Sequence, residues 1–138
     1  MLPEDVCSPI QTVQLSNGEL IVSHGIAGDP LHRVCLVGSD GQVVRSYGGP
    51  PGAGCQQVKT PVHMAVDGND FIFVADRNRR VLLLSPTLTY VREVVSCEQL
   101  KCTPLRMSLD VQRRRLYVAD DEWKDGKYTS GRVTVVNV

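Results

Sequence analysis

The sequence has few of the features that mark several large classes of protein. Only 5% of its 138 residues are aromatic, and 15 Lys and Arg side chains balance 15 Asp and Glu, so the formal net charge is zero. A chain without excess charge has no overall electrostatic basis for binding nucleic acid. It also has no apolar run of about 18 residues, the length that a membrane span needs, and no basic and apolar leader. We therefore expect a cytoplasmic protein with no membrane partner.

Cysteine and histidine are also sparse, and their spacing does not favour chemistry. The five cysteines include no C-x-x-C pair, and the histidines number three. An odd number of unpaired cysteines favours free thiols, although Cys97 and Cys102 are close enough in sequence to pair if oxidised. There is no metal-ligand spacing, no G-x-S-x-G motif and no phosphate-binding loop. The sequence therefore predicts no metal, no cofactor and no catalytic residues.

The most regular part of the chain is residues 62–96, which predicts four short strands separated by turns. Residues 71–75 are aromatic and β-branched, as suits a packed strand. The sequence DGND at 67–70 and the turn around Pro86 supply residues that favour turns, and proline cannot donate to a strand ladder. We predict a four-stranded antiparallel meander.

The same unit recurs on both sides of this stretch. The sequence FVAD that ends at Asp76 is matched by YVAD that ends at Asp120, 44 residues later. An Arg-Val pair opens the third strand of each copy, at Arg33, Arg80 and Arg132. A four-stranded sheet repeated about every 45 residues is typical of β-propeller blades. The sequence therefore predicts an all-β fold, a β-propeller of four-stranded antiparallel blades with about three blades in this chain.

The predicted blades span about residues 8–49, 60–96 and 104–138, and the third lacks its outer strand. Three blades are half of a six-bladed disc, so we expect the flat faces of the first and third blades to be uncovered. Two interpretations stay open. The chain is the C-terminal half of a larger propeller, or it is a half-disc whose homodimer completes the ring.

The repeats also resemble a known family. DRNRRV at 76–81, after a strand that ends in FVA, resembles the NHL repeat, and Thr60 and Pro61 precede its first strand. From about Ser8 to Val138 the chain is similar to the C-terminal propeller of tripartite-motif proteins, especially uncharacterised invertebrate ones. It departs from the pattern in the first blade, where His24 replaces the usual aspartate. It departs again in the third, where eleven residues separate the aspartate from the arginine.

In a propeller, the loops that follow the second strands and those that link the blades lie on one rim. We expect this rim to carry the corner after Asp76 and an inserted loop at 121–130. The candidate binding residues there are Arg77, Asn78, Arg79, Trp123, Lys124, Lys127 and Tyr128. The alternative is a solvated corner for Arg77 and Arg79 and a packing role for Trp123. Asp76 with Arg80 is expected to be a structural ion pair.

The resemblance leaves three classes of function open. The first is a scaffold that binds proteins, such as the substrate-recruiting part of a ubiquitin ligase whose RING domain lies outside this chain. The second is binding of single-stranded RNA, with basic side chains for phosphates and planar ones for bases. Three acidic residues of the insert oppose this second role: Asp121, Glu122 and Asp125. The third is a metal-dependent lyase similar to the one that completes peptide amidation, which would need histidines near the axis, where only His63 is expected. We predict a non-catalytic propeller with a protein partner, and RNA as the alternative.

Overall fold

The computed structural model describes residues 2–100 and 102–138, apart from the side chains of 105, 121–123 and 128–130. The described residues form eleven strands and no helix, so the all-β prediction is confirmed. The strands form three antiparallel sheets. Sheet 1 contains β1 (Pro9–Gln14), β2 (Leu20–His24), β3 (His32–Val37) and β4 (Val43–Gly49). Sheet 2 contains β5 (Pro61–Val66), β6 (Ile72–Asp76), β7 (Arg80–Leu84) and β8 (Tyr90–Val95). Sheet 3 contains β9 (Pro104–Asp110), β10 (Arg115–Lys124) and β11 (Lys127–Asn137).

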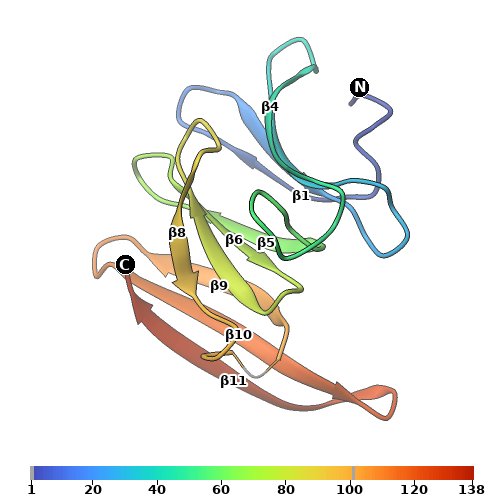
Figure 1. Cartoon of the computed structure of the whole chain (residues 1–138). Helices are drawn as coiled ribbons and strands as arrows, with labels where there is room; N and C mark the ends of the chain where they lie inside the picture. Colours follow the sequence, from blue (N-terminus) through green and yellow to red (C-terminus); the bar gives the residue numbers. More distant parts are fainter. Residues whose placement is uncertain (1, 101) are drawn as a thin grey trace.

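Each sheet is a meander in which neighbouring strands in sequence are paired. Sheets 1 and 2 have four strands and sheet 3 has three. The sheets follow one another in chain order, and the first strands β1, β5 and β9 contact each other from sheet to sheet (Figure 1). We call these the inner strands, and we call the face of a sheet that points toward the following sheet its back face and the other its front face.

Sheet 2 is buried on both faces, because its strands alternate apolar side chains between two cores. Ile72 and Val74 of β6 pack toward sheet 1, and Phe73 and Ala75 pack toward sheet 3. A strand covered on both sides is a continuous apolar run. Each fully buried Val, Leu, Ile or Phe contributes about 1.5–3 kcal/mol of hydrophobic stabilisation. The two cores therefore hold the three sheets together as one stack.

The front face of sheet 1 differs from the prediction. The segment that precedes β1 places Val6 over Val22, Cys35 and Val37, and all four are buried. The expectation that both end faces are uncovered is therefore wrong for much of sheet 1. It holds for the back face of sheet 3, where Val133 and Val135 are exposed.

The prediction of an inserted loop at 121–130 is also wrong. In the structure β10 and β11 continue through this segment and pair as far as Lys124 and Lys127. The two residues between them, Asp125 and Gly126, have φ of 53° and 78°. Positive φ at both positions is the requirement of a tight two-residue hairpin turn, for which Asp-Gly is a favoured sequence. The result is a long hairpin whose tip extends away from the stack (Figure 1).

Candidate functional site

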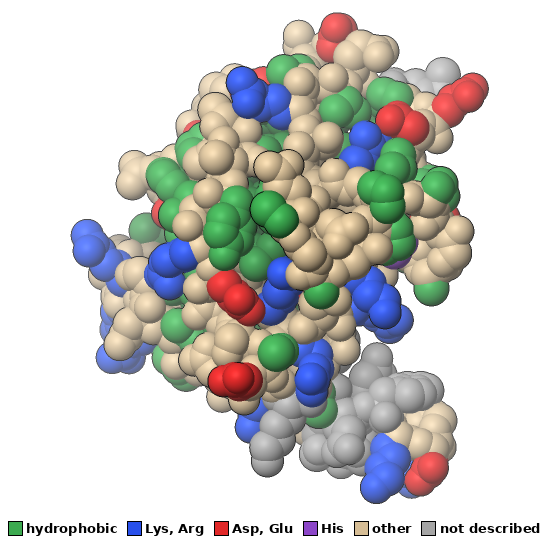
Figure 2. Space-filling model, viewed as in Figure 1, with side chains coloured by type: hydrophobic (Ala, Val, Ile, Leu, Met, Phe, Trp, Pro, Cys, Tyr) green, Lys and Arg blue, Asp and Glu red, His purple; other side chains and the backbone are tan. Residues whose placement is uncertain are grey.

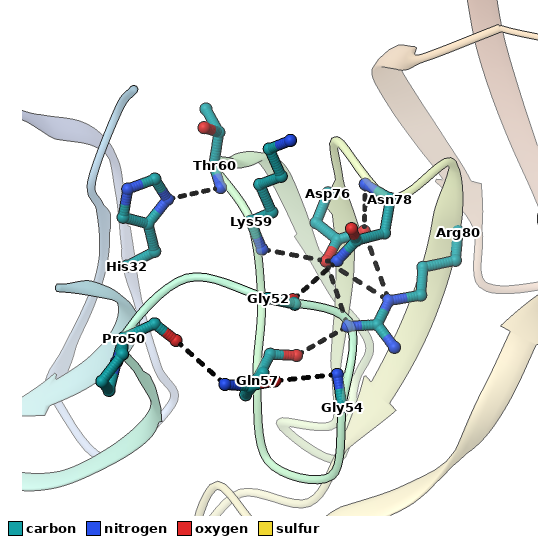
Figure 3. Close-up of polar contacts among 10 residues, drawn as sticks. All are labelled: His32, Pro50, Gly52, Gly54, Gln57, Lys59, Thr60, Asp76, Asn78 and Arg80. Atoms are coloured by element: carbon teal, nitrogen blue, oxygen red, sulfur yellow. Dashed lines mark hydrogen bonds and ion pairs between the residues drawn. The ribbon is translucent and has the colours of Figure 1, made fainter. Parts of the chain in front are cut away.

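A buried ion pair organises the corner between β6 and β7. Arg80 Nη2 lies 3.3 Å from Asp76 Oδ2 and donates a 2.6 Å bond to the Gln57 carbonyl. The Lys59 N–H and the Asn78 side-chain amide also donate to Asp76 Oδ2, at 3.3 and 2.9 Å (Figure 3). The carboxylate therefore joins the turn to the segment that leads into β5.

This arrangement confirms the prediction that Asp76 and Arg80 are a structural pair. The Asp76 side chain is 0% exposed and that of Arg80 is 13% exposed. Burial raises the pKa of the Asp76 carboxyl, and the Arg80 charge and the N–H donors act in the opposite direction. Removal of one partner from such a pair leaves an uncompensated buried charge. The corner is therefore part of the framework that presents the neighbouring side chains.

Sheet 3 repeats this corner with different partners. Arg132 Nε lies 3.6 Å from Asp120 Oδ1, and Arg132 Nη2 donates a 2.8 Å bond to the Gln99 carbonyl. The Cys102 N–H donates to Asp120 Oδ2 at 3.4 Å. The pairing inferred for the third repeat is thus present despite the long hairpin between its two members.

In sheet 1 a histidine takes the place of the aspartate. Arg33 Nε donates a 2.9 Å bond to His24 Nε2, and Arg33 Nη2 lies 3.0 Å from Asp5 Oδ2. His24 Nδ1 lies 3.0 Å from the Cys7 carbonyl. With one nitrogen accepting, the other must carry the proton that is donated to the carbonyl, so the ring is neutral. Burial and then the charge of Arg33 lower the pKa of His24, which fits this assignment.

The candidate residues of the corner divide into two kinds. Arg77 and Arg79 are exposed. Asn78 is half-buried, and its side-chain amide donates to the Gly52 carbonyl as well as to Asp76. The turn after β6, the loop after β2 and the tip of the β10–β11 hairpin lie on the same side of the stack (Figure 1). We call this side the candidate rim.

The hairpin tip contributes two further cations to the candidate rim. Lys124 and Lys127 are exposed and face each other across the turn, with the acidic Asp125 between them in sequence. Trp123 and Tyr128 are backbone partners one step further along the hairpin. Their side chains lie outside the described residues. The Asp-Gly pair is the signal in the sequence for this geometry, although a loop is predicted at this position from the sequence.

The basic side chains do not gather in one patch. Lys and Arg are distributed over the visible face, with Asp and Glu among them (Figure 2). Arg113, at the turn between β9 and β10, forms a 3.0 Å ion pair with Asp110 on the side opposite the candidate rim (Figure 1). The face in this view therefore carries charges of both signs.

Sequence reasoning missed a groove between the outer strands of sheets 1 and 2. It has a volume of about 750 Å³ and is lined by Arg45, Tyr47, Gly54, Cys55, Arg80 and Tyr90, among others. The only early signal was the Gly- and Pro-rich link between the two repeats.

The five cysteines, Cys97 and Cys102 included, are free thiols, and Cys55 is exposed in the link between the first two repeats.

The three histidines are engaged in structural hydrogen bonds at separate places. His63 Nδ1 accepts the Met107 N–H at 3.1 Å, and His32 Nδ1 accepts the Thr60 N–H at 2.9 Å (Figure 3). Among the described residues, no three His, Cys, Asp or Glu side chains come together where they could hold a metal ion. None of these residues forms a helix long and apolar enough to cross a membrane.

Comparison with protein-family models and with curated proteins returns no match. The NHL-type motifs are therefore a resemblance between sequences only. What the chain does has to be inferred from the geometry of the candidate rim.

Proposed function

We propose that the chain is a non-catalytic binding module, with its three sheets as consecutive blades of a β-propeller and a protein partner bound at the candidate rim. The observation that carries the proposal is that buried ion pairs and exposed side chains lie next to each other at the repeated corners. Buried pairs such as Asp76 with Arg80 fix the framework, while Arg77 and Arg79 beside them are exposed. Exposed loops on a rigid scaffold are the common location of binding residues.

The contacts among the inner strands support the propeller geometry. Gln11 of β1 bonds to Met64 of β5, and His63 of β5 bonds to Met107 of β9. Blades that radiate from a central axis bring their first strands together in this manner. By resemblance to tripartite-motif proteins, the proposed role extends to substrate recruitment for a ubiquitin ligase.

Single-stranded RNA is the second candidate ligand. The exposed cations Arg77, Lys124 and Lys127 on one side favour it, since phosphate contacts come from such residues. Asp125 at the hairpin tip opposes it by repelling phosphate. The two ligands differ in their salt dependence, because RNA binding releases counterions and weakens steeply with salt.

A pair of charge-reversal variants tests the proposal. Arg77→Glu combined with Lys124→Glu changes the candidate rim, and Arg113→Glu combined with Arg114→Glu changes the opposite side. Affinity capture with each purified protein, followed by mass spectrometry, should give a partner that the rim variant loses and the control variant keeps. Titration of a labelled random single-stranded RNA at about 50 and about 200 mM salt tests the second candidate. Steep salt dependence that only the rim variant removes would identify RNA as the ligand. Binding of every ligand unchanged in the rim variant would contradict both.

A further inference from the structure

The back face of sheet 3 carries an apolar patch on β10 and β11. It is formed by Tyr117, Ala119, Val133 and Val135, which are opposed in register on β10 and β11. Val133 and Val135 are 60% and 52% exposed. Val133 follows the corner arginine Arg132, as Val81 follows Arg80 in sheet 2. Val81 is 0% exposed because it lies in the core shared with sheet 3.

In each contact between inner strands, the same position of the first strand bonds to the backbone of the next inner strand. Gln11 accepts the Met64 N–H at 2.6 Å and donates to the Met64 carbonyl at 3.2 Å. His63 accepts the Met107 N–H at 3.1 Å. Both side chains come two residues after the proline that opens the strand. In β9 this position is held by Arg106, which is exposed.

The chemistry of Arg106 restricts what it can contact. Gln11 both donates and accepts, and His63 accepts, but a guanidinium has only donors. A sheet packed on the back face of sheet 3 must therefore offer a backbone carbonyl where the earlier interfaces use an N–H.

The front face of sheet 1 has the matching form. Val22 and Cys35 stand at the positions of Val74 and Leu82, the residues with which sheet 2 receives sheet 1. Leu20, at the position of the fully buried Ile72, is 37% exposed. The front of sheet 1 and the back of sheet 3 are thus two halves of the interface that occurs twice inside the chain.

The segment before β1 occupies part of the front face of sheet 1, as the corresponding segments do between the inner sheets. Val6 precedes sheet 1 as Val58 precedes sheet 2 and Leu100 precedes sheet 3. Val58 and Leu100 are both 0% exposed in the cores between sheets. A residue at this position fills the space between a sheet and the one before it.

We propose that the back face of sheet 3 docks onto the front face of sheet 1 of a second copy of this chain, with Arg106 donating to the Thr12 carbonyl of that copy. Thr12 pairs with Val22 as Met64 pairs with Val74 and as Met107 pairs with Val118. It therefore occupies the backbone position that the inner strand of each covered sheet offers. Two copies related by a twofold axis form this contact twice, so the back face of sheet 3 is covered in both copies. The inference rests on the repetition of the sheets and not on the ligand of the candidate rim.

Light scattering of the full chain at two concentrations tests this contact. We expect a discrete species of twice the 15.2 kDa chain mass. Arg106→Glu and Val133→Glu should each raise the dissociation constant of the dimer by about tenfold or more, as expected for central interface residues. Arg106→Lys, which keeps the donor, should retain the dimer. Two controls should also retain it: Val91→Glu, at an exposed valine of β8, and Arg77→Glu on the candidate rim.

The circular dichroism spectrum of each variant establishes that it is folded. A monomer at both concentrations, or an open-ended series of larger species, would overturn the proposal. So would a dimer that persists in both interface variants, or one that Val91→Glu disrupts equally. Loss of rim binding in Arg77→Glu with the dimer intact separates this result from the test of the proposed function.

Discussion

At the scale of single residues, histidines replace other side chains in the repeat and introduce a dependence on pH. His63 holds the Met107 N–H with an unprotonated nitrogen, and His24 accepts from Arg33 in the same way. Burial is the main cause that lowers the pKa of both rings. The nearby charge of Arg106 adds to this at His63, and that of Arg33 adds to it at His24.

We predict that acidification weakens the fold through these two rings. Their pKa values lie below the ordinary 6.5 in the folded chain, so the unfolded chain takes up protons first as the pH falls. The stabilisation is complete above pH 6.5 and is lost as the pH falls toward the folded pKa values. His63→Gln should reduce this loss, because Gln accepts the Met107 N–H at every pH, as Gln11 does for Met64.

Urea unfolding of both proteins at about pH 7.5 and about pH 5.5 measures the difference. The free energy of unfolding should decline less on acidification in His63→Gln than in the natural sequence. An equal decline in the two proteins would mean that the pKa of His63 is the same in the folded and the unfolded chain.

Ser23 is a second residue of sheet 1 that differs from its counterparts in sheets 2 and 3. Its hydroxyl is fully buried without a hydrogen-bond partner among the described residues. Ala75 and Ala119 stand at the same position of sheets 2 and 3, one residue before the aspartate of each corner. A buried polar group without a partner costs about 1–3 kcal/mol.

We predict that Ser23→Ala leaves the free energy of unfolding unchanged or raises it by about 1 kcal/mol. Chemical denaturation of the two proteins under identical conditions measures this. A clear loss of stability would show that the hydroxyl has a partner, such as a buried water, in the folded chain.

At the scale of elements, the short segments that enter each sheet are as important as the strands. Each carries one apolar side chain into a core, and its backbone is held by the arginine of the following corner. Gln57 and Gln99 are the carbonyl partners in sheets 2 and 3, and Asp5 is the carbonyl partner in sheet 1. These segments therefore join neighbouring sheets although they contain no strand.

We predict that Leu100→Ala destabilises the chain by about 3 kcal/mol, since a fully buried leucine leaves a cavity when it is truncated. Val91→Ala, at a half-exposed position of β8, should have little effect. The midpoint of urea unfolding measures both. Similar midpoints for the two variants would show that the segment before β9 does not help to hold sheet 3.

The strands and most turns could be predicted, because β-branched runs and turn residues are local signals. The hairpin arm was not predicted because the eleven residues between Asp120 and Arg132 exceed the spacing of the other corners and indicated an inserted loop, although Asp-Gly at 125–126 marks a hairpin. The role of Val6 was missed for another reason. A single valine in an irregular segment has no period, so its burial depends on a sheet that folds elsewhere in the chain.

At the scale of the whole molecule, the repeat predicted three similar units but not the bonds between them. Gln11, His63 and Arg106 are chemically unlike, so nothing in the sequence marks them as one position. The position becomes visible only when the inner strands are placed together. The common side of the turns that carry Arg77 and Lys124 could be predicted, because each turn follows the second strand of its repeat.

The position of the entering segments also defines where this protein can be divided. Val58 packs in the core between sheets 1 and 2, and the Gln57 carbonyl accepts from Arg80 of sheet 2, although both residues lie before the first strand of sheet 2. A fusion protein that begins directly at Pro61 would lack Gln57 and Val58, which hold sheet 2 in place. The transferable unit begins earlier, in the exposed link around Gly54, and ends after β8. Duplicating or grafting that unit should preserve the corner, the filling side chain and the sheet together.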